Sequence, residues 1–497
     1  MEGFKQFLKI IGIVLACLLG VFVLLCVLTA IIPSFYVFGY KFVLGSTRET
    51  EKIIDYQEEA NLSLNIHTEN YSVNLIADKE LEGLVSYSYA GSYFGFANMS
   101  SSRLIVTEDI GELSFSMREP SGLLIKSGSE INIHVNPEVV YDINFVSDSG
   151  SLCVSDLVLN KINIISGTGD VRIETTEQKD KESENDEDTL EEIKFVQNLA
   201  CLNITADDGF YDFSSYDEIS VLGTSNISIG NGELKFKDLN SSLNIRGKKC
   251  SITADNIISP EGISMVCSDG VVSAKIIDSE MNEIVVISDN LSFSADKVIG
   301  QVGITATGGK IAIKEILGDS IIKTTTANIS VEKANNNIFA TATSGNILVE
   351  KYYEIGQFVT TSGNITVNSL SEYNENYYST IASKNGSVSF ENKVNKSSVS
   401  ITEDGVAKIK IWSVAQTGNV EHDVFVPNGE ASIGIMAYAT DIFRLRIVGE
   451  VSGSINSLIV YANDNYIYHP GDSTEYSNEA TFTCNGKFLY FSKLDEQ

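Results

Sequence analysis

Short alternations of apolar and polar residues fill most of the chain, and one phrase introduces many of them. Segments 343–349 (TSGNILV) and 361–367 (TSGNITV) share a small residue, a glycine, a polar residue and two apolar residues one position apart. The phrase recurs at 149–154, 168–173, 308–313 and 385–390, and without its glycine at 225–229 and 326–331. Alternation with a period of two predicts short β-strands that bury one side.

The glycine, or the residue that replaces it, returns at nearly constant distance. Positions 309, 327, 345, 363, 386 and 405 are separated by 18, 18, 18, 23 and 19 residues, and positions 270, 289 and 309 by 19 and 20. No interval contains a long amphipathic helical pattern, so each predicts two or three strands of about four residues. One such unit cannot bury its apolar side alone, but stacked units can. We predict an all-β fold, a parallel β-helix or solenoid with coils of about 18–23 residues.

The phrase also predicts a register. Glycine suits a corner where φ is positive or where a Cβ has no room, and asparagine is the best substitute there. The asparagines after several glycines could bond through their amides from one coil to the next. Ile329, Ile347 and Ile365 hold the same place in three phrases, so we expect them to stack as one interior ladder.

A β-sandwich is the alternative fold. It would place Asn-Gly or Asp-Gly turns between paired strands about every 8 to 12 residues. The turns at 208–209, 269–270 and 404–405 instead fall in register with the repeated phrase. We therefore interpret them as solenoid corners.

Several sections depart from the repeat, which we place at 136–454. Residues 50–135 alternate over longer segments and predict an irregular β cap, and 455–497 predict a C-terminal β cap that closes the other end. Segment 177–194 holds nine acidic and three basic residues, so we predict a disordered loop that leaves one coil.

The pattern near the N-terminus is different. Residues 10–32 carry no charge, and 23 residues at about 1.5 Å each span roughly 34 Å, enough for a bilayer core of about 30 Å. We predict a single-pass transmembrane α-helix there, with a short cytoplasmic tail at 1–9, a juxtamembrane linker at 33–49 and an extracellular C-terminal domain at the cell membrane. Cys17 leaves lipidation or cleavage as an alternative.

Charge narrows the choice of partners. The chain has 35 basic and 66 acidic residues, a formal net charge of −31, which disfavours nucleic-acid binding. An anionic envelope would also be repelled unless divalent cations bridge the two surfaces. The carboxylates of 177–194 could bind Ca²⁺, although their spacing fits no known calcium loop. We predict no other cofactor.

Cysteine and histidine give no metal-binding pattern. The cysteines outside the predicted helix show no CxxC spacing, and we interpret them as small buried hydrophobic residues rather than disulfides or metal ligands. They are Cys153, Cys201, Cys250, Cys267 and Cys484. The four histidines are far apart, and we interpret them as surface or cap residues. They are His67, His134, His422 and His469.

Motifs of catalysis are equally scarce. Residues 303–310 resemble a phosphate-binding loop with the wrong glycine spacing, and no Gly-x-Ser-x-Gly elbow occurs. We therefore predict that the protein is not an enzyme and has no catalytic, cofactor-binding or metal-binding residues. A β-helix polysaccharide lyase or hydrolase is the alternative, since the tyrosines at 352–353, 377–378 and 466–468 could stack on sugars.

The repeated Ser-Gly-x-Ile-x-Val phrase, preceded by a segment like 131–137 (INIHVNP), resembles the bacterial family of repeat-bearing surface domains labelled "putative adhesin". The resemblance covers roughly 60–460, and it is interrupted by 177–194 and by worn phrases between 200 and 300. It implies a β-solenoid surface domain that carries no catalytic residues. We expect a membrane-anchored adhesin or rigid surface scaffold that contacts envelope polymers or the surface of a host or neighbouring cell. An envelope sensor or scaffold for a membrane partner is the second interpretation.

Overall fold

The structure is a computed structural model, and the chain is described in two compact units, Met1–Tyr216 and Asp217–Gln497. The described residues are 2–31, 34–37, 40–55, 61–81, 84–98, 103–118, 121–175, 195–370, 377–392, 396–412, 419–436, 441–454, 466–468 and 478–493. The predicted acidic loop at 177–194 therefore lies outside the described residues. Within them the fold is one helix followed by β-strands that pair mainly in parallel, so the predicted parallel β-solenoid is confirmed.

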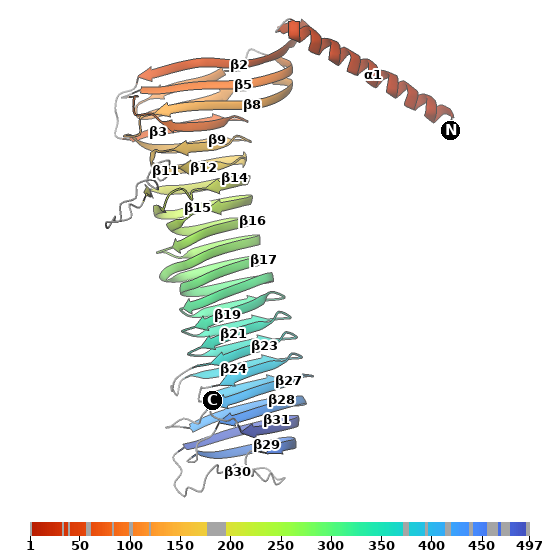
Figure 1. Ribbon diagram of the computed structural model, residues 1–497, viewed down its shortest axis with the longest axis vertical. Helices are drawn as coiled ribbons and strands as arrows, with labels where there is room; N and C mark the ends of the chain where they lie inside the picture. The colour runs from red at the N-terminus through yellow and green to blue at the C-terminus, as the bar shows by residue number, and fades with distance from the viewer. Residues whose placement is uncertain are drawn as a thin grey trace, which may run out of the picture. The chain divides into compact units, whose positions relative to one another are not determined.

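The first unit stacks its strands in two parallel ladders (Figure 1). One ladder is β3, β9, β11 and β14, and the other is β4, β10 and β12. Alternate residues point inward, as in β3, where Leu62, Leu64 and Ile66 are buried. The elements are α1 (Glu2–Ile31), β1 (Ser34–Val37), β2 (Tyr40–Asp55), β3 (Asn61–Thr68), β4 (Ser72–Ala77), β5 (Leu84–Asn98), β6 (Arg103–Asp109), β7 (Glu112–Arg118), β8 (Ser121–Val135), β9 (Val140–Ser147), β10 (Leu152–Ser155), β11 (Val158–Thr168), β12 (Val171–Glu174), β13 (Val196–Leu199) and β14 (Cys201–Asp212).

Antiparallel strands close the beginning of this unit. Strands β1, β2, β5 and β8 pair in sequence as antiparallel neighbours, and β6 and β7 form a hairpin. Strand β3 lies between β7 and β9, and β4 lies between β8 and β10. The first coil of the chain is therefore covered by strands that come later in the sequence.

Helix α1 occupies the apolar stretch near the N-terminus and begins at Glu2, upstream of the predicted start at Ile10. The residues before Ile10 are mostly good helix formers, so the helix extends into the predicted tail. Among the described residues, no helix combines the length and hydropathy required to cross a bilayer. The membrane span at 10–32 stays a prediction.

The second unit also pairs its strands mainly in parallel, and from β18 to β27 each coil has two strands. We call β18, β20, β22, β24 and β26 the first ladder and β19, β21, β23, β25 and β27 the second ladder. The elements are β15 (Glu218–Lys235), β16 (Asp238–Ile258), β17 (Ile263–Leu317), β18 (Ser320–Thr324), β19 (Asn328–Ala334), β20 (Ile338–Ala342), β21 (Ile347–Tyr352), β22 (Gly356–Thr360), β23 (Ile365–Ser369), β24 (Tyr378–Ser383), β25 (Val388–Asn392), β26 (Lys396–Ile401), β27 (Val406–Trp412), β28 (Asn419–Met436), β29 (Asp441–Ser454), β30 (Tyr466–Tyr468) and β31 (Asn478–Lys493).

The predicted interior ladder is confirmed. Ile329 lies opposite Ile347, and Ile347 lies opposite Ile365, in the second ladder. Their side chains are 1%, 1% and 0% exposed. Burial stabilises the fold by roughly 1.5–3 kcal/mol for each of these side chains.

The corner glycines are explained by contact with the preceding coil. A Cβ on Gly345 would lie 1.9 Å from the carbonyl oxygen of Ala327, and a Cβ on Gly363 would lie 2.0 Å from that of Gly345. At Gly309 a φ of +107° adds a second reason. Both roles that the sequence suggested for glycine therefore occur, since Gly169 of another phrase also has a positive φ of +152°.

Asparagines join the coils at the next position. The backbone N–H of Asn346 donates to Oδ1 of Asn328, and the backbone N–H of Asn364 donates to Oδ1 of Asn346, both at 2.9 Å. The asparagine ladder predicted from the sequence is present. Its hydrogen bonds run from main chain to amide oxygen, rather than between amides.

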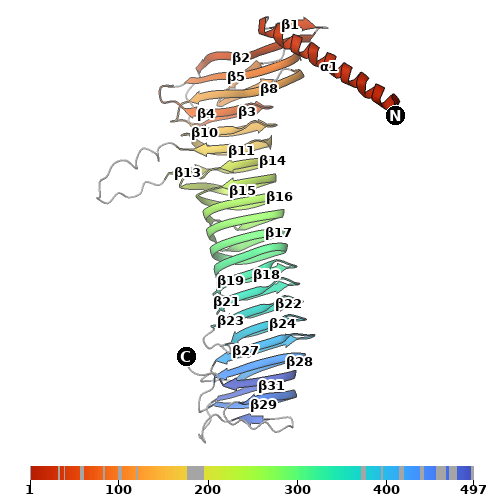
Figure 2. The ribbon, with the colours of Figure 1, turned by 45° about the vertical axis from the view of Figure 1, so that its right-hand side comes forward.

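The C-terminal end of the second unit is not in chain order. Strand β31 pairs in parallel with β28 on one side and with β29 on the other, and Figure 2 shows it between them. Strand β30 pairs antiparallel with β29. The chain therefore places β29 one layer beyond β28, and the later strand β31 inserts between the two.

Candidate functional site

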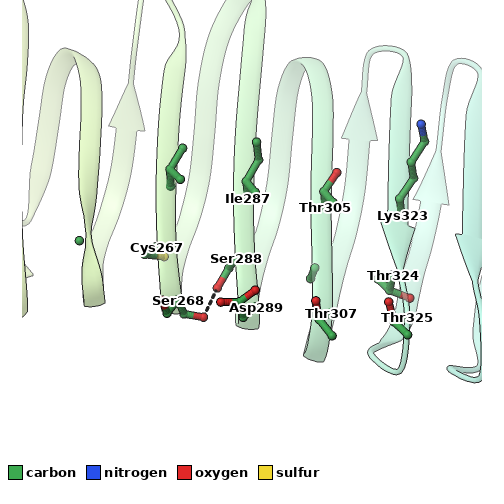
Figure 3. A pocket seen from close by; sticks show the side chains of 13 residues that line it. Cys267, Ser268, Ile287, Ser288, Asp289, Thr305, Thr307, Lys323, Thr324 and Thr325 are labelled. Carbon is green, nitrogen blue, oxygen red and sulfur yellow. Dashed lines mark hydrogen bonds between the residues drawn. The ribbon is translucent and has the colours of Figure 1, made fainter.

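A shallow depression of about 480 Å³ crosses one side of the second unit. It runs over successive coils where strands of β16, β17 and β18 reach their corners (Figure 3). The lining comes from Gly247, 266–268, 287–289, 305–307 and 323–325. Because these segments are about one coil apart in sequence, the repeat itself builds the surface.

The outward-pointing side chains that line the depression change from apolar to polar from one coil to the next. Val266 and Ile287 are 42% and 45% exposed, and the next positions are the exposed Thr305 and Lys323. Lys323 lies opposite Thr305 on one side and Thr341 on the other. The surface therefore begins apolar and continues as a polar row.

The inward row of the same segments carries hydroxyl groups that serve the corners. The Ser288 hydroxyl lies 3.0 Å from the carbonyl oxygens of Ser268 and Asn290, and can donate to one at a time. The Thr324 hydroxyl donates to the carbonyl oxygen of Ala327 at 3.0 Å. These hydroxyls satisfy backbone groups that the turn would otherwise leave buried and unbonded.

Cys267 stands in this inward row beside Cys250 of the preceding coil. A hydrogen bond from Cys250 lowers the pKa of Cys267 to about 7, and the Ser288 hydroxyl adds to the lowering. Burial and the carboxylates of Asp269 and Asp289 act in the opposite direction. The same hydrogen bond, together with burial, raises the pKa of the Cys250 thiol.

Sequence reasoning treated these two cysteines as unrelated small hydrophobic residues. The signal that could have joined them is their separation in sequence, from 250 to 267, which is close to the length of one coil. The other cysteines that the structure describes are also free thiols: Cys17 is exposed, Cys153 and Cys201 are half-buried, and Cys484 is buried. In the described parts of the chain, no three His, Cys, Asp or Glu side chains come together in a way that could hold a metal ion.

The histidines do not share one environment. His67 is exposed, and His134 lies 3.8 Å from the carboxylate of Asp78. His422 is 1% exposed, with Nδ1 2.8 Å from the Ser397 hydroxyl, so its interpretation as a surface or cap residue was wrong. It occupies an inward position of β28 opposite Ser397, where strand alternation requires burial. His469 lies outside the described residues.

Several described lysines form ion pairs with a carboxylate one coil away. Lys161 pairs with Asp142 at 3.1 Å, and Lys333 pairs with Glu315 at 2.8 Å. Further pairs one coil apart are Lys237–Asp217, Lys275–Asp255, Lys314–Asp296 and Lys384–Glu403. Such exposed pairs add little stability. Each pair neutralises one carboxylate, and the remaining excess of carboxylates keeps the chain acidic.

Comparison with known proteins gives a structural likeness and no sequence match. No family model matches the chain, and no curated protein matches it. A crystal structure of a "putative cell adhesion protein" from Clostridium sporogenes is similar over 90% of this chain and 100% of that chain, at 10% identity and a TM-score of 0.17. A likeness at this level carries no argument about function.

Proposed function

We propose that the protein is a non-catalytic scaffold of the cell surface that binds other surfaces through rows of repeated side chains, as an adhesin does. The observation that carries this proposal is the outward polar row in which Thr305, Lys323 and Thr341 face one another from coil to coil. Neighbouring strands are about 4.8 Å apart, so the row offers one donor group at each step. Such a surface suits a polymer or another repetitive surface through many weak contacts.

The lack of catalysis is part of the proposal. Glycoside hydrolysis needs two carboxyl groups about 5 to 9.5 Å apart across a cleft. The depression is shallow, and Asp289 is the one carboxylate among the described residues that line it. This arrangement favours binding over hydrolysis or elimination of a polysaccharide.

Anchoring by α1 is a separate proposal. Residues 10–32 are uncharged, and apolar side chains along α1 are exposed, including Ile13, Leu19 and Leu24. Lipid would cover these side chains, with the β-solenoid outside the cell. A chain lacking residues 1–32 should then appear in the medium or soluble fraction, whereas the full chain should sediment with membranes and lose its mass to protease added to intact cells. Protection from that protease in intact cells would reverse the orientation.

Adhesion is tested with beads coated with the purified chain and exposed to cells or immobilised envelope polysaccharides. Binding should weaken when Thr305, Lys323 and Thr341 are replaced together by glutamate. A control variant in which glutamate replaces Ser330 and Leu348 of the second ladder should bind as the wild type does. Retention in calcium and loss in a chelator would identify cation bridging as the contact. Equal binding by both variants would overturn the assignment of this row, and release of reducing ends would favour the hydrolase alternative.

A further inference from the structure

Two cysteines of successive coils meet at one corner of the second unit. The corner 247–250 reads Gly-Lys-Lys-Cys, and the same corner of the next coil, 267–270, reads Cys-Ser-Asp-Gly. The strand register places Gly247 opposite Cys267 and Cys250 opposite Gly270. Each coil thus contributes one cysteine and one glycine, at opposite sides of the same corner.

The glycines leave room for the sulfur atoms. A Cβ on Gly247 would lie 2.6 Å from Sγ of Cys250, and a Cβ on Gly270 would lie 2.8 Å from Sγ of Cys267. Each sulfur therefore leans across the corner, toward the side on which the other cysteine stands one coil away. The two side chains are 2% and 6% exposed, so both thiols are buried at this corner.

From this geometry we propose that Cys250 and Cys267 form an oxidisable dithiol, which closes a disulfide between neighbouring coils on reaction with a small-molecule or protein disulfide. The Cys267 thiolate attacks one sulfur of the oxidant, whose S–S bond breaks and releases a thiolate. Cys250 then loses its proton to solvent and attacks Sγ of Cys267, which releases the second thiolate. The pair loses two electrons and two protons, and the oxidant becomes two thiols.

The surroundings fix the order of attack. Cys267 lines the depression of Figure 3 and is the more exposed of the two thiols, whereas Cys250 is not part of that lining. The lowered pKa of Cys267 favours its thiolate near neutral pH, in spite of Asp269 and Asp289. Cys250 keeps its proton, which Sγ of Cys267 and the carbonyl oxygen of Ile229, 3.7 Å away, can both accept.

The two cysteines lie on neighbouring coils, whose parallel strands are about 4.8 Å apart. Because each cysteine stands opposite a glycine rather than opposite the other cysteine, the bond would cross the corner diagonally. The bond would close the single coil that runs from Cys250 to Cys267 and tie it covalently to its neighbour. This inference does not depend on the proposed adhesive function or on the location of the protein.

The test uses the full chain, reduced and then exposed to oxidised glutathione at neutral pH. After acid quenching and denaturation, maleimide labelling should count five thiols where the reduced chain has seven, and peptide mapping should find Cys250 joined to Cys267. The oxidised chain should also melt at a higher temperature than the reduced chain. Seven remaining thiols, or a bond between other cysteines, would overturn the proposal.

Variants distinguish the two roles. In Cys250→Ser, glutathione should remain attached to Cys267 as a mixed disulfide, whereas Cys267→Ser should retain every remaining thiol. Cys153→Ser and Cys484→Ser are matched controls and should still lose two thiols. In a Cys250→Ala chain, the pH midpoint of Cys267 alkylation should rise above the wild-type value near 7, because alanine has no group that can donate a hydrogen bond to Cys267. An unchanged midpoint would contradict contact between the two thiols.

Discussion

Asn346 and Asn364 occupy the same corner of successive coils, and the backbone N–H of Asn364 donates to the side-chain oxygen of Asn346 at 2.9 Å. The residue after each asparagine is an interior isoleucine, so Ile347 and Ile365 face each other one position later. In each of these coils, the residue that forms the polar link at the corner is therefore directly followed by the residue that forms the apolar link inside.

Because the two positions are adjacent but differ in burial, we predict that an aspartate lowers the stability of the protein strongly at one position and only slightly at the other. Ile347→Asp places a charge in a fully packed interior and should destabilise the protein by several kcal/mol. Asn346→Asp keeps an oxygen that accepts the Asn364 N–H and is exposed, so it should change the free energy of unfolding by less than about 1 kcal/mol. Chemical denaturation of both variants checks the register, and equal midpoints would contradict it.

The corner glycines predict a second contrast. Gly345→Ala would bring a Cβ within 1.9 Å of the Ala327 carbonyl oxygen, so it should destabilise the protein by more than about 1 kcal/mol. Gly303→Ala is the matched control, because its nearest contact would be an ordinary 3.5 Å to the Glu283 carboxylate. Thermal melting should separate the two, and a comparable loss in both would show that contact with the Ala327 carbonyl oxygen is not responsible.

His422 predicts a dependence of stability on pH. Burial lowers its pKa from 6.5 to about 3, so the unfolded chain binds a proton there that the folded chain does not. Its contribution is therefore complete above about pH 6.5 and is lost as pH falls toward 3. Between pH 7 and pH 5 the loss amounts to about 2 kcal/mol.

The measurement compares urea unfolding of the wild type and of His422→Leu at both pH values. The wild type should lose about 2 kcal/mol more than the variant, since other titrating groups are common to both chains. His67→Gln, at an exposed site, should follow the wild type. Parallel pH curves for wild type and His422→Leu would contradict the burial of a neutral imidazole.

The coil period predicts which deletions are tolerated. Removal of 343–360 takes out one complete coil and joins Ala342 to Thr361, which restores the Thr-Ser-Gly-Asn phrase at the same corner. This variant should unfold cooperatively with a small change in melting temperature, because each coil contacts mainly its neighbours. Removal of 343–351 ends within a coil and should abolish cooperative unfolding, as read by circular dichroism.

The ladders could be predicted from the sequence because the pattern that determines them lies within each repeat and in the spacing of neighbouring repeats. The regular return of the phrase and the alternation around Ile347 together determine which residues stack, and both are visible without knowledge of distant contacts. The burial of His422 was missed because a lone histidine carries no periodic signal. Its inward position follows only after the register of β26 and β28 is known.

The cysteine corner shows the same limit at the candidate site. Cys250 and Cys267 do not occupy equivalent positions of the repeat, since one follows the corner and the other precedes it. Comparison of aligned phrases cannot pair them. The coil length brings them together, and the glycine opposite each one provides the space.

The position of β31 has a consequence for the timing of assembly. Strand β29 is synthesised before β31, yet β31 separates it from β28. A nascent chain that has emerged as far as Ser454 therefore has no native partner strand for β29, and elongation alone cannot complete this end. The coils from β15 to β28 can form in order of synthesis. The last layers must wait and form together once 478–493 has left the ribosome.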